Sequence, residues 1–580
     1  MPHPICATTY IHTYIRTYIH TVSPEICDNM TATRLTSDEL RQRVISNTGE
    51  DGRLKDNTLD LDARTVAILS KRHQISKNFG FTSMLSFSTT VLVSWEAFAV
   101  TFQGGLVNGG PSTLVYGLIF SFFGSLATAA SLAEMASISP TSGGQYHWVA
   151  LLAPRKYAII FSWFAGWITA FMRIAVTASV AFLVATMIQG LIILNYPDTY
   201  APKQWHGTLM YWAVTVVIVL INIFGIRFLP HIETLALILH VIFFFCILVP
   251  LVHLAPRSSS EFVFKSFANN GGWESNGVSW CIGLLTSTYA FSGVDGASHM
   301  AEEVDNAAVV VPRTMIWSII VSGVLCFGMS IAILFSIGDV AAALETPTLF
   351  PIIEIFFNAT KSYPATNAMV SALIISIFFS ALGLLASSSR LIWAFARDDG
   401  VPFSRYFSHV DTQFGIPVRA ILWSAVVIAL LGLINLGSTT AFNAMVSLAL
   451  LGQYSTYVIP TIFILARRVH PGKNIPFGPW ELGKWGIPIN IFTIVFSFVT
   501  IGFNVLPPYF PVTAVNMNYA GVVFGAALII CGLLWFVRGK RHYAGPIREV
   551  MENGNVRSAL LNRERESAYG VEVHDADKRA

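Results

Sequence analysis

The stretch YAFSGVDGASHM, residues 289–300, places an acid between two glycines in the middle of an apolar segment. A second apolar segment, VLVSWEAFAV at residues 91–100, also carries an acid near its centre. A carboxylate at bilayer depth costs at least a few kcal/mol, so such residues usually face a cavity on a substrate or ion pathway. Asp295 and Glu96 are therefore the first candidates for a functional site.

The composition of the chain indicates a membrane protein. Of 580 residues, 54% are hydrophobic and 12% are charged, a balance that a water-soluble fold of this size cannot hide from solvent. Apolar segments long enough to cross a bilayer of about 30 Å recur along the sequence. Twelve membrane-spanning helices are predicted, at residues 81–106, 114–133, 157–194, 209–226, 235–254, 278–300, 314–337, 368–396, 420–436, 441–466, 487–506 and 519–537. The expected fold class is an all-α polytopic membrane protein.

The basic residues of the loops predict the orientation, because cytoplasmic loops carry an excess of Lys and Arg. With the N-terminus inside, twelve basic residues lie in cytoplasmic loops and four outside; they are Arg155, Lys156, Arg227, Arg313, Arg390, Arg397, Arg405, Arg419, Arg467, Arg468, Lys473 and Lys484 against Lys203, Arg257, Lys265 and Lys361. Both termini are therefore expected in the cytoplasm.

The ends of the chain differ from its centre in composition. Residues 1–79 are expected to form a disordered cytoplasmic tail, residues 80–537 the twelve-helix membrane domain, and residues 538–580 a charged cytoplasmic tail that is also disordered. The period of four in TYIHTYIRTYIHT, residues 9–21, resembles a translated nucleotide repeat. It suggests that residues 1–29 are an extension and that Met30 is the true start.

Several classes of function are not supported. A net charge of +3 gives no reason to expect a nucleic-acid partner. The sequence has no Walker-type phosphate loop, no HExxH metal motif and no GxSxG nucleophile turn, so neither an enzyme nor a cofactor or metal is expected. The sequon at Asn358 falls in a predicted external loop and is a candidate for glycosylation.

The charges inside the spans suggest an internal repeat. With Arg390 assigned to the inner end of helix eight, the predicted interiors contain only Glu96, Arg173 and Asp295. Transporters with inverted repeats bind substrate near the midplane, where the first helix of each repeat is broken. Repeats at 80–254 and 278–467, followed by helices eleven and twelve at 487–537, make helices one and six such partners.

A break in helix six is indicated directly, because Gly293 and Gly296 flank the acid and glycine loosens a helix. The break in helix one is inferred by symmetry alone. The substrate-binding residues predicted around the two breaks are Ser94, Trp95, Glu96, Arg173, Tyr289, Phe291, Gly293, Asp295 and Gly296. Trp95, Tyr289 and Phe291 are ambiguous, since aromatic residues in membrane helices more often serve packing.

Three long motifs resemble a known family. SLAEMASISPTSGGQYHWVALLAP at 131–154 resembles the signature between helices two and three of the amino acid, polyamine and organocation permeases. AFSGVDGASHMAEEV at 290–304 and ASSSRLIWAFARDDGVPFS at 386–404 resemble the fungal amino acid and choline permease group. The resemblance, over about residues 70–540, implies twelve helices with inverted five-helix repeats, alternating access and ion-driven uptake across the plasma membrane.

The substrate is expected to be a small nitrogenous solute. Amino acid permeases of the wider family hold the substrate carboxylate on a glycine-rich break in helix one, whereas this chain has Ser94, Trp95 and Glu96 there. An indole beside a carboxylate attracts a cation, by about 1 to 2 kcal/mol for the cation–π contact when desolvated. Choline or a related cation is therefore favoured. An amino acid or γ-aminobutyrate, an alkaloid-like amine, and a non-transporting nutrient sensor are the alternatives.

The roles of the other polar residues stay open. Arg173 neutralises Glu96 or Asp295, receives a substrate carboxylate, or faces the outer vestibule. His240 is a candidate proton carrier or a neutral histidine bonded to a neighbouring helix. Ser387, Ser388 and Ser389 either offer hydroxyl oxygens to Na⁺ or allow close packing of helix eight. The acids Glu302 and Glu303 either gate the inner mouth or form a solvated helix end that pairs with Arg313. Proton coupling is the expectation, mainly from the resemblance.

Overall fold

The computed structural model describes residues 77–437, 441–470, 475–514 and 516–546, all within the unit Leu61–Ala580. The regular structure of these residues is helical, and the only β contacts among them are two isolated bridges, Phe79 with Val304 and Asn108 with Asn269. Eleven of the described helices are long and apolar enough to cross a membrane. The expectations for residues 1–29 and for Met30 lie outside the described residues.

The first five spans follow the predicted order. They are α4 (Phe81–Leu92) with α5 (Ser94–Thr101) and α6 (Gln103–Val107); α7 (Gly110–Ser112) with the π-helix Thr113–Gly117 and α8 (Leu118–Ile138); α10 (Arg155–Asn195); α11 (Gln204–Phe224); and the 3₁₀ turn Ile226–Phe228 with α12 (Leu229–Leu254). The connections contain α9 (Gln145–Leu152) and α13 (Ser260–Lys265).

The remaining spans continue the series. They are α14 (Asn276–Tyr289) with α15 (Gly296–His299) and the 3₁₀ turn Ala301–Glu303; α16 (Ala307–Ser336); α19 (Tyr363–Arg397); α21 (Val418–Gly432) with α22 (Ile434–Gly437); α23 (Ala441–Val469); α24 (Gly486–Asn504); and α25 (Ala520–Leu534) with the π-helix Trp535–Gly539 and α26 (Lys540–His542). Shorter elements are α17 (Val340–Leu344), α18 (Pro351–Thr360), α20 (Ser404–Phe407) and the 3₁₀ turn Gly483–Trp485. The sixth predicted span is broken into two pieces and is not among the eleven long helices.

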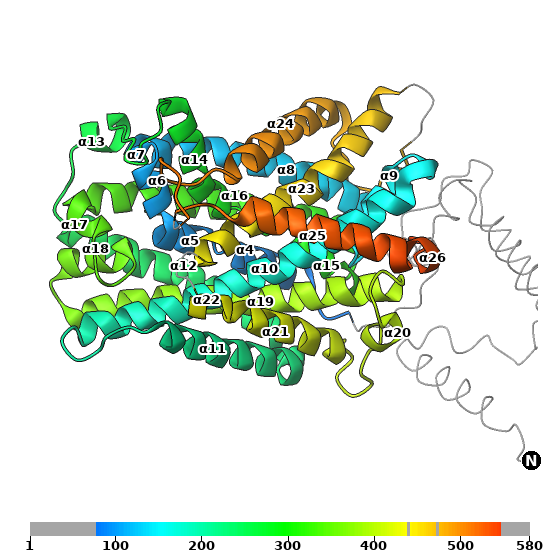
Figure 1. Ribbon diagram of the computed structural model, residues 1–580, viewed down its shortest axis with the longest axis horizontal. Coiled ribbons are helices and arrows are strands. Elements are labelled where there is room, and N and C mark those ends of the chain that lie inside the picture. Colours follow the sequence, from blue (N-terminus) through cyan, green and yellow to red (C-terminus); the bar gives the residue numbers. More distant parts are fainter. Residues whose placement is uncertain (1–76, 438–440, 471–474, 515, 547–580) are drawn as a thin grey trace, which may run out of the picture. The chain divides into compact units, whose positions relative to one another are not determined.

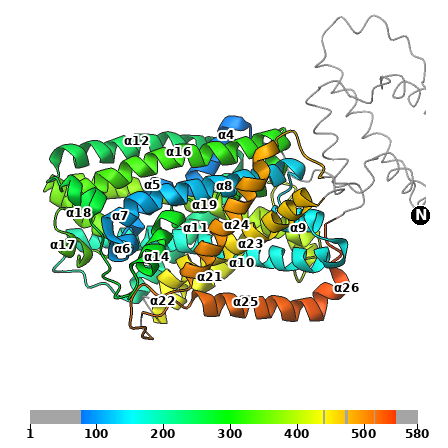
Figure 2. The same cartoon turned by 90° about the horizontal axis from the view of Figure 1, so that it is seen from above.

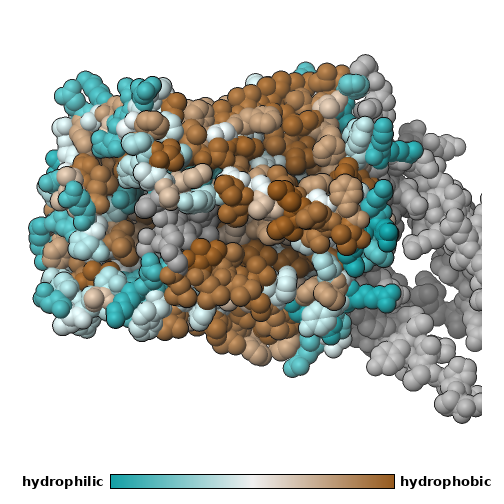
Figure 3. Space-filling model, in the orientation of Figure 1, coloured by the Kyte–Doolittle hydropathy of each residue, from teal (hydrophilic) through white to brown (hydrophobic). Residues whose placement is uncertain are grey.

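The connecting elements gather at two opposite ends of the helical array. Figure 1 shows α13, α17 and α18 at one end of the long helices and α9, α20 and α26 at the other. These are the loops that the basic residues assign to the outside and to the cytoplasm, respectively. Between the two ends runs a band of hydrophobic side chains, with hydrophilic side chains beyond it (Figure 3). This pattern fits a protein whose middle is solvated by lipid.

Helix packing separates a buried group of helices from peripheral ones. The helix α10 packs on α19 and α23, while α4 packs on α12, α16 and α19. In contrast, α25 lies along one side of the array (Figure 2). Only 11% of the most apolar 18-residue stretch within Ala520–His542 is buried. The broken first helix and α10 are therefore enclosed by protein, which is where buried polar groups find partners.

The last helix extends beyond its predicted end at Val537. The π-helix Trp535–Gly539 and α26 continue it to His542, and Tyr543 is 4% exposed. The hydroxyl groups of Tyr543 and Ser162 lie 2.7 Å apart. The expected disorder of the C-terminal tail is therefore wrong for residues 538–543, because Tyr543 buries its ring against Trp163 of α10.

Candidate functional site

Helix six is interrupted at the buried acid. Between α14 and α15, the amides of Phe291 and Ser292 donate to the carbonyls of Thr288 and Tyr289, three residues back instead of four. Gly293 has φ of 105°, a conformation that residues with a side chain rarely adopt. The ladder of the α-helix is therefore lost next to Asp295, in the position that the glycine pair indicates.

Helix one is interrupted as well, without a glycine. Val93, between α4 and α5, has φ of 43° and ψ of 43°, which is the left-handed region. A β-branched residue there is an outlier that costs about 1 to 3 kcal/mol and persists only where the surroundings enforce it. Such strain concentrates at functional sites. The break comes directly before Ser94, Trp95 and Glu96.

The two breaks are neighbours in space. A methyl group built on Gly296 would lie 3.1 Å from Cγ1 of Val91, and one on Gly293 would lie 3.5 Å from the same atom. The hydroxyl of Ser380, on α19, donates to the carbonyl of Val91 at 2.9 Å. The ends of α4 and α15 therefore meet against α19, and a side chain at Gly296 would require its neighbours to shift.

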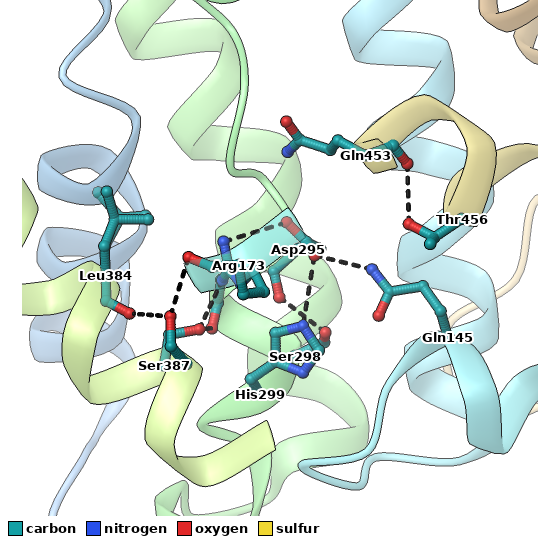
Figure 4. A network of polar contacts seen from close by, with 12 residues as sticks. Gln145, Arg173, Asp295, Ser298, His299, Leu384, Ser387, Gln453 and Thr456 are labelled. Carbon is teal, nitrogen blue, oxygen red and sulfur yellow. Dashed lines mark hydrogen bonds and ion pairs between the residues drawn. The ribbon is translucent and has the colours of Figure 1, made fainter. Parts of the chain in front are cut away.

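Four side chains from four elements converge on Asp295, which has no exposed surface. Its Oδ1 accepts a hydrogen bond from the Tyr457 hydroxyl at 2.6 Å and lies 3.5 Å from Nη1 of Arg173. Its Oδ2 accepts from Nε2 of Gln145 at 2.8 Å and lies 3.3 Å from Nε2 of His299. Figure 4 shows Gln145, Arg173 and His299 approaching the acid from different sides. The carboxylate is thus held by α9, α10, α15 and α23.

The side chain of Arg173 bonds to residues of helix six (α14 and α15) and helix eight (α19). Besides its ion pair with Asp295, its Nη2 donates to the hydroxyl of Ser387 on α19 at 2.5 Å. Ser387 in turn donates to the carbonyl of Gly296 at 3.3 Å. Of the two acids that the sequence offers as partners, the structure pairs Arg173 with Asp295, and no described ion pair joins it to Glu96.

Glu96 forms a separate buried pair with His240. The Oε1 atom of Glu96 lies 2.7 Å from Nδ1 of His240 on α12, and the side chains are 0% and 2% exposed. The Trp95 ring lies 5.7 Å from the imidazole. Four buried polar atoms of this cluster have no hydrogen-bond partner, namely Ser94 Oγ, Trp95 Nε1, Glu96 Oε2 and His240 Nε2. Glu96 also lies in the first turn of α5, where the helix dipole favours a negative charge.

The other predicted residues near the breaks are buried and mostly engaged with protein. The Tyr289 hydroxyl lies 3.4 Å from that of Ser179, and the Phe291 ring packs edge-on against Phe122. Ser388 donates to the carbonyl of Leu384. Ser389 donates to the carbonyl of Ala386 and accepts from Arg390. The Asn358 side chain, on α18, bonds Glu354 and Lys361, and its glycosylation stays a prediction.

The structure corrects the expected partner of the two acids after helix six. Arg397, not Arg313, donates to both carboxylate oxygens of Glu302, at 2.6 and 2.7 Å. Glu303 is 1% exposed and accepts from Nε of Arg390 at 2.7 Å. Both acids are largely buried and pair with arginines of α19, so a solvated helix end that pairs with Arg313 is wrong. Arg390 and Arg397 of α19 pair with these two acids in space, although Arg313 is closer in the sequence. The two ion pairs hold the end of helix six against α19 at the cytoplasmic end.

A second polar cluster lies at the same end. Tyr146 and His147 of α9 both bond Oδ2 of Asp398, at 2.9 and 2.8 Å. Burial and the neighbouring Asp398 carboxylate raise the pKa of Tyr146 well above its ordinary value. Tyr146 is therefore a neutral hydrogen-bond donor at physiological pH.

Sequence reasoning missed several polar residues. Two more acids are buried within helices, Glu134 in α8 and Glu233 in α12, so the expectation of only three interior charges is wrong. Glu134 pairs with Arg468. Both acids lie one or two residues outside the predicted spans, because the helices begin and end further out than the apolar windows. The partners Gln145 and Tyr457 carry no charge, and no sequence signal distinguishes them.

Eleven apolar helices, a twelfth that is broken at a buried acid, and ionisable groups at the breaks define a multi-pass membrane protein of the transporter class. The family model described as amino acid permease matches residues 79–528, and the chain belongs to this family.

Similar proteins from other organisms agree with this class. The choline transporter of Saccharomyces cerevisiae is 31% identical over 83% of this chain and 85% of its own length. A putative amino acid/polyamine transporter of Macrophomina phaseolina is 34% identical over 75% and 96%. The swainsonine transporter of Arthroderma benhamiae is 30% identical over 76% and 86%. The family and these relatives make the chain a membrane transporter of small molecules and not an enzyme.

Proposed function

We propose that this protein is a secondary active transporter of the plasma membrane that carries choline or a related small organic cation by alternating access, driven by a proton gradient. The transporter class follows from the family, and the finer statement is inferred from the groups at the two helix breaks. The resemblance to the choline transporter of Saccharomyces cerevisiae supports the same substrate class.

One observation carries the proposal: the buried carboxylate of Glu96 lies at the break of helix one beside the indole of Trp95. Its partner is His240, and Oε2 of Glu96 has no hydrogen-bond partner. A buried anion needs a compensating positive charge, and a quaternary ammonium supplies one without hydrogen-bond donors of its own. The Trp95 face adds a cation–π attraction of about 1 to 2 kcal/mol. The pair suits a small organic cation.

Acids outnumber arginines around the two helix breaks. Arg173 pairs with Asp295, so of the two acids and one arginine at the breaks, one acid, Glu96, has no guanidinium partner. A cationic substrate would bring this group to neutrality, whereas a substrate carboxylate would add to the excess. This balance favours a cation over a simple anion.

A zwitterionic amino acid or γ-aminobutyrate is the second candidate. It is favoured by one feature, since Nε and Nη1 of Arg173 have no hydrogen-bond partner although both are buried. A substrate carboxylate fits there only if it competes with Asp295 and Ser387 for the guanidinium group. The substrate ammonium group would then lie at Glu96.

The test is a flux assay with the purified protein in liposomes. Uptake of radiolabelled choline, γ-aminobutyrate, a polyamine and neutral amino acids is measured at several pH values, with and without Na⁺. Choline uptake that increases with an inward proton gradient and does not need Na⁺ is expected. Uptake of amino acids with no uptake or competition by choline would refute the substrate, and no flux of any solute would favour a sensor.

A further inference from the structure

Of the buried acids among the described residues, one lies outside the two networks at the helix breaks and, unlike Glu134 and Glu303, has no ion-pair partner. Glu233, in the first turns of α12, has no exposed surface and belongs to none of the described ion pairs. Its Oε2 accepts a hydrogen bond from the hydroxyl of Thr90 on α4, at 2.5 Å. Its Oε1 has no hydrogen-bond partner. The group is therefore a carboxyl in the protein interior with a single polar neighbour.

The free oxygen faces apolar surface at the point where three helices meet. A methyl group built on Gly383 of α19 would lie 3.2 Å from Oε1 of Glu233, 2.8 Å from Cγ2 of Val91 and 3.3 Å from Cε2 of Phe87. The carboxyl oxygen, the two apolar side chains and the bare backbone of α19 thus crowd one another. A metal cation such as Na⁺ needs a shell of several oxygen ligands, which these neighbours do not provide.

Within the part of the chain that the structure describes, no charged group compensates Glu233. The elements that pack on α12 are α4, α16, α18, α19 and the turn Ile226–Phe228. Apart from α4, which has none, these elements and α12 itself carry titratable or charged groups that are either exposed or bonded elsewhere: Arg227, His231, His240, Cys246, His253, Arg313, Cys326, Glu354, Tyr363, Arg390 and Arg397. An ionised carboxylate without a partner is costly in such a place, whereas a neutral carboxylic acid costs much less.

We propose that Glu233 is the binding site of the co-transported proton. This inference rests on the proposed function, in which a proton gradient drives transport. The reaction is the simplest possible, in which the carboxylate takes up H⁺ to form a carboxylic acid and later releases it on the other side of the membrane. The partner that changes between the two states is Thr90.

The location of Thr90 links the proton site at Glu233 to the substrate site at the helix breaks. It lies three residues before the strained Val93, and the next residue, Val91, contacts the broken part of helix six at Gly293 and Gly296. Movement of α4 relative to α12 separates the Thr90 hydroxyl from Glu233 and admits water to the acid. A carboxyl that loses a hydrogen-bond donor and gains water changes its affinity for a proton. Rearrangement at the substrate site and proton release are thereby linked through α4.

The test compares wild type, Glu233→Gln and the control Glu354→Gln in liposomes. Glu354 is a partly buried carboxyl on the short helix α18, outside the helix breaks. With the membrane potential clamped at zero, a pH gradient of about one unit should sustain about a tenfold accumulation of radiolabelled choline if one proton accompanies each substrate. Wild type and Glu354→Gln are expected to accumulate choline, and Glu233→Gln is expected to equilibrate it without accumulation.

A second measurement does not depend on the substrate. Infrared difference spectra of the purified protein are recorded while the pH is raised, and the carbonyl stretch of a protonated carboxylic acid is followed. The band is expected in wild type and Glu354→Gln at neutral pH and absent from Glu233→Gln. An identical band in Glu233→Gln would overturn the proposal, whatever the substrate.

The outcomes separate the two proposals. If wild type carries no choline, the choline assignment fails, and the infrared measurement alone decides on Glu233. If Glu233→Gln accumulates choline as wild type does, Glu233 is not the proton site. If His240→Gln loses accumulation while Glu233→Gln keeps it, the proton is carried at His240, and the proposal is refuted.

Discussion

Nη1 of Arg173 lies 3.5 Å from Oδ1 of Asp295, and neither side chain is exposed. This ion pair joins the longest helix, α10, to the broken part of helix six. Removing one member of a buried pair typically costs about 3 to 5 kcal/mol, because the other charge is left uncompensated. A substitution in this pair is therefore expected to lower stability as well as transport. Stability and transport need separate measurements.

Asp295→Asn should abolish transport and lower the thermal stability of the detergent-solubilised protein. The amide cannot neutralise Arg173, and a destabilisation of about 3 kcal/mol or more is expected from the unpaired guanidinium. Transport is measured by uptake into liposomes and stability by fluorescence-monitored unfolding.

The double variant Arg173→Gln with Asp295→Asn separates folding from function. Without either charge, most of the stability should return, whereas transport should not. Full transport by the single Asp295→Asn variant would show that the acid takes no part in the cycle. Recovered stability together with recovered transport would show that the pair serves packing alone.

Glu96→Gln should impair cations more than zwitterions. Loss of the carboxylate removes the charge that complements an ammonium group, so the apparent affinity for choline is expected to fall about tenfold or more. Competition by unlabelled choline and γ-aminobutyrate in one uptake assay gives the comparison. The control is His240→Gln, which keeps the acid and loses its imidazole partner. Equal losses for both solutes in Glu96→Gln would make the acid structural.

The sequence predicted the number and order of the helices well and the contacts between side chains poorly. Eleven of the twelve predicted spans are long apolar helices of the described residues, the sixth is the broken α14 and α15, and the glycines around Asp295 indicated that break. The break in helix one was expected only by symmetry, because Val93 is a residue that normally avoids the left-handed region. A backbone forced by tertiary packing leaves no local signal.

The partners of charged residues were harder to predict than the charges. Arg173 was recognised as a partner for an acid, although its choice between Glu96 and Asp295 depends on how α10 and helix six pack. Glu302 and Arg397 are 95 positions apart and meet because α19 returns beside helix six. Gln145 and Tyr457 reach Asp295 from a connecting helix and from α23. Such contacts follow from the fold and not from sequence spacing.

Gly296→Ala should be harmful although alanine is the better helix former. The added methyl group would lie 3.0 Å from Nη2 of Arg173 and 3.1 Å from Cγ1 of Val91. Overpacking of this kind costs about 1 to 3 kcal/mol, and the displaced guanidinium would weaken the Asp295 pair. Thermal unfolding and uptake are both expected to fall.

Gly277→Ala is the matched control for that substitution. Its methyl group would have Ser275 Oγ at 3.6 Å as its nearest neighbour, which is ordinary contact. Because alanine is favoured over glycine in helices by up to about 1 kcal/mol, this variant should be as stable as wild type or slightly more stable. A Gly296→Ala protein with normal uptake and stability would mean that the close approach of the two breaks is not required.

The charge pair Glu302 and Arg397 is expected to hold helix six against α19 at the cytoplasmic end. Glu302→Arg or Arg397→Glu places like charges together and should reduce uptake, whereas the double reversal should restore part of it. Two parallel hydrogen bonds join the wild-type pair, so a coupling free energy of about 1 kcal/mol or more is expected from the double-mutant cycle. The cycle is measured on both uptake and thermal stability, since a gate affects the first more than the second. Additive effects in the two single reversals, with no rescue in the double variant, would show that the pair does not act as a gate.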